Sequence, residues 1–192
     1  MCPRKSPTMI QRRGMLVVAF FSTVFLLGVK LSWAGWYQNG ETVPDTGWRK
    51  SRGDFGAMIL LTKKAQEFVA AWGQPTASVP ISVAQTVHRG ERITAFISFV
   101  GCTPEQGGLC NITGDFVILK PDGSVYGEFS QVELWTGKSA LPIGQLGLGV
   151  RHATVEIEPD DPLGRYLVKA KVHDHNGNIT LELEQVFVVT ED

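Results

Sequence analysis

The stretch Glu158-Pro-Asp-Asp-Pro-Leu-Gly-Arg-Tyr166, followed by Leu-Val-Lys-Ala-Lys-Val-His173, decides the fold. Apolar and polar residues alternate along its second half, and a period of two predicts a strand with one buried and one exposed face. The buried face is expected to carry Tyr166, Val168, Ala170 and Val172. Before this strand, Asp161, Pro162 and Gly164 predict a tight turn, because Pro fixes φ and Gly accepts positive φ.

A tyrosine just inside a strand, directly after such a turn, resembles the tyrosine corner of immunoglobulin-like sandwiches. In that motif the phenol bonds a backbone group a few residues upstream; the alternative for Tyr166 is an ordinary core aromatic. The resemblance covers residues 79–190. Because this strand lacks cysteine, the chain is similar to fibronectin-type or macroglobulin-like domains rather than to antibody domains. The resemblance implies an all-β Greek-key sandwich of about seven antiparallel strands, and a small barrel is the alternative. It implies no function.

We expect three segments along the chain: a signal peptide at 1–34, an N-terminal extension at 35–78 and the sandwich at 79–192. In the extension, residues 57–62 predict a strand and residues 63–72 a short helix, with one apolar face formed by Ala65, Phe68, Val69 and Trp72. The aromatic residues of the extension, Trp36, Tyr37 and Trp48, are expected to pack on the domain, with a docking role as the alternative. In the sandwich, residues 115–120 predict a strand buried on both sides.

The first 34 residues have the features of an export signal. A basic head is followed by an uncharged apolar run at 15–29, and small residues at Ser32 and Ala34 predict cleavage after Ala34. An uncleaved anchor is the alternative, although the run is shorter than the roughly 20 residues of a spanning helix. After cleavage we expect no membrane span. The expected location is the periplasm or the extracellular space.

The charge of the chain after cleavage argues against nucleic-acid binding. Residues 1–34 contain five of the 18 Lys and Arg residues but none of the 19 Asp and Glu residues. The remaining chain has a net charge of about −6, whereas binding to a phosphate backbone needs clustered Lys and Arg.

Cleavage also leaves two cysteines, Cys102 and Cys110, which form an even pair in an oxidising compartment. A disulfide between them is the expectation. A redox pair or a thiolate metal site is the alternative, but the spacing is not C-x-x-C and no histidine lies between the cysteines.

The sequence contains no recognisable catalytic motif. There is no G-x-S-x-G, no P-loop, no dinucleotide-binding glycine pattern and no H-E-x-x-H. We therefore expect no enzyme and no cofactor. The most specific alternative is a periplasmic copper or zinc protein that uses His173 and His175, because imidazoles two residues apart on a strand point the same way. Asp160 and Asp161 are weighed as calcium ligands and interpreted as turn formers.

These observations predict an exported, non-enzymatic binding or structural module that acts through protein–protein contacts in the cell envelope. The expected working surfaces are the loops at 102–110 and 136–149, because rigid sheets present variable loops. The expected partner is another envelope or extracellular protein. A second expected mode is the addition of a partner's strand at an open sheet edge.

Overall fold

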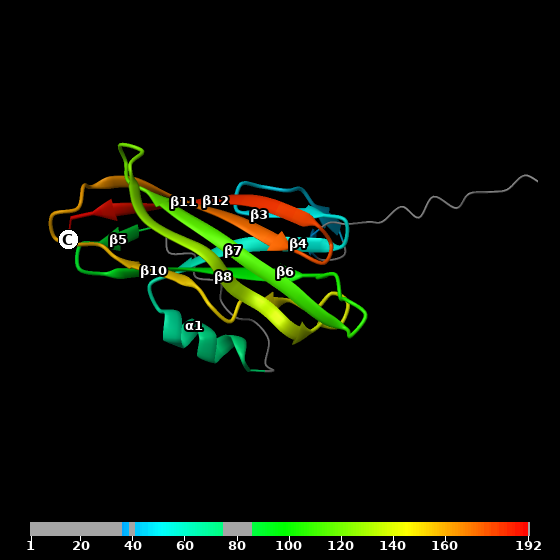
Figure 1. Cartoon of the computed structure of the whole chain (residues 1–192). Helices are drawn as coiled ribbons and strands as arrows, with labels where there is room; N and C mark the ends of the chain where they lie inside the picture. Colours follow the sequence, from blue (N-terminus) through cyan, green and yellow to red (C-terminus); the bar gives the residue numbers. More distant parts are fainter. Residues whose placement is uncertain (1–35, 39–40, 75–85, 192) are drawn as a thin grey trace, which may run out of the picture. The chain divides into compact units, whose positions relative to one another are not determined.

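A computed structural model of the chain describes residues 36–38, 41–74 and 86–191 (Figure 1). The predicted signal peptide and its cleavage point after Ala34 lie outside the described residues. The elements, in chain order, are β1 (Trp36–Gln38), β2 (Glu41–Val43), β3 (Arg49–Arg52), β4 (Phe55–Thr62), α1 (Ala65–Trp72), β5 (Thr86–His88), β6 (Arg92–Val100), β7 (Leu109–Leu119), β8 (Val125–Ser139), β9 (Gly147–Leu148), β10 (Ala153–Glu156), β11 (Gly164–Asp174) and β12 (Ile179–Thr190).

The fold is all-β, as the sequence predicts, and most strands lie in two five-stranded sheets (Figure 1). The first sheet has the order β10-β6-β4-β3, with β9 also paired to β6. The second sheet has the order β5-β12-β11-β7-β8. The strand pairs are antiparallel except for β12 with β5, which is parallel. A small separate hairpin is formed by β1 and β2.

The strand that decides the fold is β11, and its predicted alternation is confirmed. The inward side chains are at most 2% exposed: Tyr166, Val168, Ala170 and Val172. The Tyr166 hydroxyl donates a hydrogen bond to the carbonyl oxygen of Pro162 at 2.9 Å. The phenol therefore bonds the turn four residues upstream, as in a tyrosine corner.

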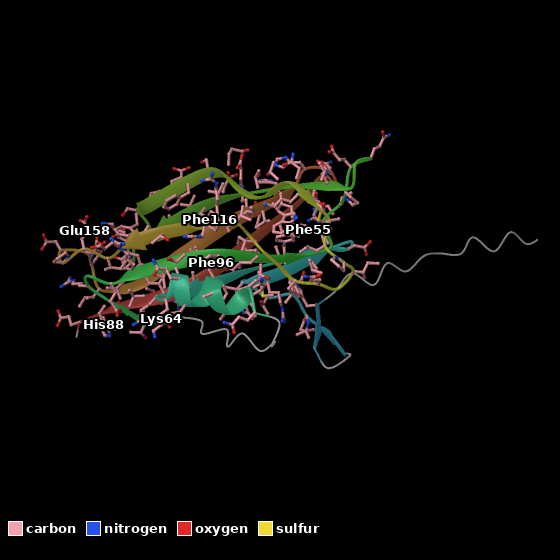
Figure 2. The ribbon with its side chains drawn as sticks, turned by 90° about the horizontal axis from the view of Figure 1, so that it is seen from below. Phe55, Lys64, His88, Phe96, Phe116 and Glu158 are labelled. Carbon is pink, nitrogen blue, oxygen red and sulfur yellow. A yellow bond between two sulfur atoms is a disulfide. The ribbon has the colours of Figure 1, made fainter. Side chains whose placement is uncertain are left out.

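The main core lies between the two sheets, where Phe55 of β4 and Phe116 of β7 are both fully buried. A second apolar cluster lies on the other face of the first sheet, under α1. Figure 2 views the molecule from the side of this helix, with Phe96 of β6 beside it. The rings of Phe68 and Phe96 are 5.1 Å apart between centroids. Because β4 has apolar layers on both faces, all eight of its residues are buried.

The segment before residue 79 contributes two strands to the first sheet. β3 pairs with β4, and β4 pairs along its length with β6. Of the three aromatic residues expected to pack on the domain, Trp36 and Trp48 lie in the α1 cluster, and the side chain of Tyr37 lies outside the described part of the structure. No helix in the described parts of the chain is long and apolar enough to cross a membrane.

Three local expectations are wrong. Val69 of α1 is 47% exposed rather than on the packed face. Over residues 115–120 only Phe116 and Ile118 are buried, while Val117 and Leu119 are half-buried, because the outer face of the second sheet carries long polar side chains instead of a second layer. Finally, β8 continues to Ser139, so the irregular stretch begins at residue 140 rather than 136.

Candidate functional site

Both loops predicted as working surfaces lie at one end of the sandwich. β7 begins at Leu109, which pairs with Ser139 at the end of β8, and the Ala140 N–H donates to the Gly108 carbonyl oxygen at 3.0 Å. The β11–β12 turn lies at the same end, because His175 donates its backbone N–H to the carbonyl oxygen of Asn111, near the start of β7, at 3.0 Å. We call the residues 101–108, 140–146 and 175–178 the loop end. The opposite end, marked by His88 and Glu158 in Figure 2, is called the corner end.

The first loop of the loop end is closed by a disulfide between Cys102 and Cys110, as the sequence predicts. Their Cα atoms are 6.1 Å apart, and both side chains are buried in the main core. The disulfide therefore joins the end of β6, in the first sheet, to the start of β7, in the second. A short covalent ring of this kind restricts the conformations of the loop that it closes.

The buried carboxylate of Asp174 connects this loop to the β11–β12 turn. Asp174 is 0% exposed, and its oxygens accept the backbone N–H groups of Thr103 at 2.8 Å and of Gly177 at 3.3 Å. Asn176 donates its side-chain amide to the carbonyl oxygens of Thr103 and Leu109, both at 3.1 Å. A Cβ at Gly177 would collide with Thr103 and Asp174, so the turn fits closely against the loop. Buried polar groups satisfied in this way fix a single arrangement of the backbone.

The second loop ends in a defined turn with an apolar tip. The Gln145 N–H donates to the Pro142 carbonyl oxygen at 3.0 Å, and Gly144 has φ +79°, a conformation that a type II turn requires at its third residue. The second position of this turn is Ile143, whose side chain is fully exposed, and Leu146 is 39% exposed beside it. The backbone thus presents an aliphatic side chain to solvent on a turn with restricted geometry.

The predicted histidine pair lies on the outer face of the second sheet. The rings of His173 and His175 are 5.9 Å apart between centroids, so the two imidazoles do point the same way. Both ring nitrogens of His173 have partners: Nδ1 lies 3.0 Å from Thr180 Oγ1 and Nε2 lies 3.2 Å from Asp115 Oδ2. His175 Nε2 lies 2.8 Å from Thr113 Oγ1. Within residues 36–38, 41–74 and 86–191, no group of three or more His, Cys, Asp or Glu could hold a metal ion.

The acidic pair at the corner divides into one exposed and one buried carboxylate. Asp160 is exposed, whereas Asp161 is 5% exposed. The Asp161 carboxylate accepts from Lys120 Nζ at 3.1 Å, from the Glu158 N–H at 2.8 Å and from the Tyr126 hydroxyl. Burial by itself raises the pKa of Asp161, but the hydrogen bonds from Tyr126, Glu158 and Lys120 outweigh it and hold the pKa below the usual value. Asp161 is therefore a structural carboxylate of the turn.

Burial and the Asp161 carboxylate act on both corner tyrosines, although Tyr166 is fully buried and Tyr126 only half-buried. Burial, together with the nearby Asp161 charge, raises the pKa of Tyr166 to about 12. Burial and the hydrogen bond to Asp161 also raise the pKa of Tyr126. Both phenols stay protonated at neutral pH and act as hydrogen-bond donors.

A surface groove of about 660 Å³ lies at the base of the 140–149 loop, and its lining is Gln131, Val132, Glu133, Val150, Arg151 and His152. Gln131 has φ +52°, and its N–H donates to Asp115 Oδ1 at 2.7 Å. The His152 ring packs 4.6 Å from Phe96 between centroids, and burial lowers the pKa of this imidazole. The groove brings an amide, a carboxylate and a guanidinium beside two valines.

Sequence reasoning missed several of these residues. In the sequence, Asp174 stands out only because it lies between His173 and His175. It occupies the same inward register as Val172 and Ala170. That register is the signal that could have identified a buried carboxylate. Gln131 carries no such signal, because its positive φ depends on the register shift between β7 and β8.

Comparison with known proteins assigns no family. No family model matches the chain, and no curated protein matches it. The similar solved structures include a Niemann-Pick type C2 protein from the Japanese carpenter ant, with 9% identity, a TM-score of 0.39 and coverage of 69% of this chain and 89% of that one. A CARDB domain from Pyrococcus furiosus, solved with metal ions, has 9% identity and a TM-score of 0.36, and the match covers 78% of this chain and 100% of that one.

A third similar structure is a Pseudomonas fluorescens alkylpurine DNA glycosylase bound to DNA. It has 19% identity and a TM-score of 0.35, and the match covers 55% of this chain but only 27% of the glycosylase chain. All three TM-scores lie below 0.5. These similarities therefore support no argument about family or activity.

Proposed function

We propose that this protein is an exported, non-enzymatic binding module of the cell envelope, and that it contacts a partner protein through its loop end. The observation that carries the proposal is the position of Ile143. An aliphatic side chain is fully exposed at the tip of a turn, on a loop whose first residue, Ala140, bonds Gly108 of the loop closed by the disulfide.

Rigidity of the loop end supports this proposal. Binding is weakened when loops must be ordered on association, so a surface fixed in advance binds with a smaller entropic cost. The disulfide, the Asp174 carboxylate and the Asn176 amide all restrict the loop at 101–108 before any partner arrives. A single exposed aliphatic residue is common on protein surfaces. Its place on a restricted turn beside a restricted loop is what favours a contact role.

We also propose that the two sheets have an immunoglobulin-like, Greek-key arrangement. The hydrogen bond from Tyr166 to Pro162 supports this proposal, because it reproduces the tyrosine corner of that class. The mainly antiparallel pairing in two facing sheets also supports it. In such sandwiches, loops gathered at one end form the binding surface, and the loop end of this protein would act in the same way.

The disulfide supports the proposed export, since oxidised cysteine pairs persist outside the cytoplasm. We propose a periplasmic or extracellular location with cleavage after Ala34. Mass spectrometry of the N-terminus of the protein purified from the envelope would check this, with Gly35 expected as the first residue.

The test of the binding role is a pull-down from envelope extracts with the tagged protein and two charge variants. Ile143→Asp places a carboxylate at the tip of the loop end. Val125→Asp is the matched control, because Val125 is 57% exposed and lies at the corner end. Both positions are exposed, so we expect both variants to fold with little change in stability.

The expected result is a stoichiometric partner that is captured by the unmodified protein and by Val125→Asp but lost with Ile143→Asp. The captured partner is then purified, and its affinity is measured directly for the three proteins. Equal capture by both variants, or equal loss in both, would contradict a contact through the loop end.

A further inference from the structure

The turn between β11 and β12 has the sequence His175-Asn176-Gly177-Asn178. The Asn178 N–H closes it by donating to the His175 carbonyl oxygen at 3.3 Å, and Asn176 is exposed. Asparagine is a chemically labile residue, and its side-chain amide is lost most readily when glycine follows, because glycine has no Cβ to shield its backbone nitrogen. The loop end therefore contains a candidate site of covalent modification.

The amide of Asn176 is also one of the groups that hold the loop end together. Its nitrogen Nδ2 donates to the carbonyl oxygens of Thr103 and Leu109, both at 3.1 Å. Thr103 follows Cys102 and Leu109 precedes Cys110, so one side chain bonds both ends of the disulfide loop. The donor in both bonds is the nitrogen atom that deamidation removes.

The backbone nitrogen of Gly177, which is the attacking atom in deamidation, is weakly restrained. Its N–H donates to Asp174 Oδ1 at 3.3 Å, which exceeds the upper limit of about 3.2 Å for ordinary N–H···O bonds. The fold also requires glycine here, because an added Cβ would lie 2.4 Å from Thr103 Oγ1. The close fit of the turn against the loop thus demands the residue that makes Asn176 labile.

We propose that Asn176 is a site of spontaneous deamidation, and that the loss of this one amide releases the loop end. The Gly177 nitrogen gives its proton to a base in the solvent and forms a bond to Asn176 Cγ. The Cγ–Nδ2 bond breaks, and Nδ2 takes up a proton and leaves as ammonia. Water then opens the cyclic imide at either carbonyl, which produces aspartate or isoaspartate. Water is the co-reactant, and nothing is oxidised or reduced.

Either product removes the bonds that the amide makes to the disulfide loop. A carboxylate has no donor at neutral pH, so the carbonyl oxygens of Thr103 and Leu109 would face another acceptor. Its charge would also lie near the carboxylate of Asp174, which is 0% exposed. Isoaspartate in addition inserts a carbon atom into the backbone beside Gly177, where space is lacking. The loop at 101–108 would then be less ordered, whether or not the loop end contacts a partner.

The first test follows the purified protein over time in mildly alkaline buffer at body temperature, with peptide mapping by mass spectrometry. We expect first-order conversion at Asn176, with isoaspartate and aspartate separated by chromatography. Asn178 and Asn111 are controls in the same molecule and should keep their amides, because isoleucine follows each of them. The incubation lasts until a free peptide of residues 172–181 has converted completely. An intact Asn176 amide at that time, or equal conversion of all three asparagines, would overturn the proposal.

The second test compares Asn176→Asp with its matched control, Asn178→Asp. Both variants add one carboxylate to the same turn, but only the first removes the donor to Thr103 and Leu109. Amide hydrogen exchange in residues 101–108 should become at least about tenfold faster in Asn176→Asp and stay within about twofold in Asn178→Asp. If Asn176→Asp does not fold, deamidated protein isolated by ion exchange replaces it. Unchanged exchange, or an equal change in both variants, would overturn the release of the loop end.

Discussion

At the scale of single residues, the buried carboxylate of Asp161 determines the corner from which β11 starts. It bonds the ammonium of Lys120, the backbone of Glu158 and the phenol of Tyr126, while Arg89 donates to the carbonyl oxygen of the same residue at 3.0 Å. The Tyr166 phenol bonds the next residue of the same turn. The turn is therefore fixed by side chains from several separate segments of the chain, which explains why the direction of β11 is so well specified.

Asp161→Asn should make the protein less stable at neutral pH, and the loss should shrink in acid. Asparagine keeps acceptors for the N–H and phenol but loses the negative charge opposite Lys120, a loss of about 1–3 kcal/mol for charge-assisted hydrogen bonds. The folded-state pKa of Asp161 lies below its unfolded value. The stabilisation is therefore complete above the unfolded pKa of about 3.9 and is lost as pH falls through the folded pKa.

Urea unfolding between pH 7 and pH 2.5 measures this difference. The gap in unfolding free energy between the original protein and Asp161→Asn should close as the pH falls. Asp160→Asn, the exposed neighbour, is the control and should change little at any pH. A gap that stays constant from pH 7 to pH 2.5 would contradict a stabilising role for the Asp161 charge.

What the sequence predicts at this scale depends on whether a residue acts within its own strand. Tyr166 could be predicted, because its position after a Pro-Leu-Gly turn carries the signal locally. Asp174 and Gln131 could not be assigned their roles, because the partners that define them lie far away in the sequence. Thr103, for example, is 71 residues from Asp174.

At the scale of elements, β4 shows why the boundary near residue 79 does not mark the start of the sheets. Its eight residues are all buried, so the sequence lacks the alternation that identifies a half-buried strand. The cause is α1, which covers one face of β4 while the second sheet faces the other. The apolar run at 57–62 predicts the strand itself, but its pairing with β6 depends on contacts that periodicity does not reveal.

The packing of α1 on the first sheet should depend on Phe68 and not on its neighbour. Phe68 is 8% exposed and contacts the rings of Phe96 and Trp72, so Phe68→Ala should lower the unfolding free energy by about 3–5 kcal/mol. Val69→Ala is the matched control, because Val69 is 47% exposed. Thermal or urea unfolding measures both. Equal effects of the two substitutions would argue against the observed face of the helix.

The disulfide loop should stabilise the whole molecule and not only its own end. Replacing both Cys102 and Cys110 with Ala should cost about 2–3 kcal/mol by the entropy of closing a short loop. The unfolding free energy of this variant is measured with urea in non-reducing buffer, and that of the original protein is measured after reduction. Comparing the two separates the effect of the covalent bond from the effect of the changed side chains. If reduction left the unfolding free energy unchanged, the loop would not need the bond for its order.

At the scale of the whole molecule, the two ends of the sandwich differ in how they are stabilised and in what they expose. The corner end is dense in charge-assisted contacts, with Asp161 bonded to Lys120 and Lys63 paired with Glu91 at 3.0 Å. The loop end is fixed by a disulfide and a buried carboxylate, and it presents Ile143 to solvent. The sequence predicts which loops project, but their meeting at one end follows from the register of β7 with β8 and β11.

The most direct test of a contact through the loop end is a hydrogen-exchange footprint of the protein with the partner captured in the pull-down. We predict that binding slows exchange in residues 101–108, 140–146 and 175–178, while the turn at 120–124 and the corner at 157–163 stay unchanged. Protection concentrated at the corner end, with the loop at 140–146 still exchanging freely, would contradict this prediction.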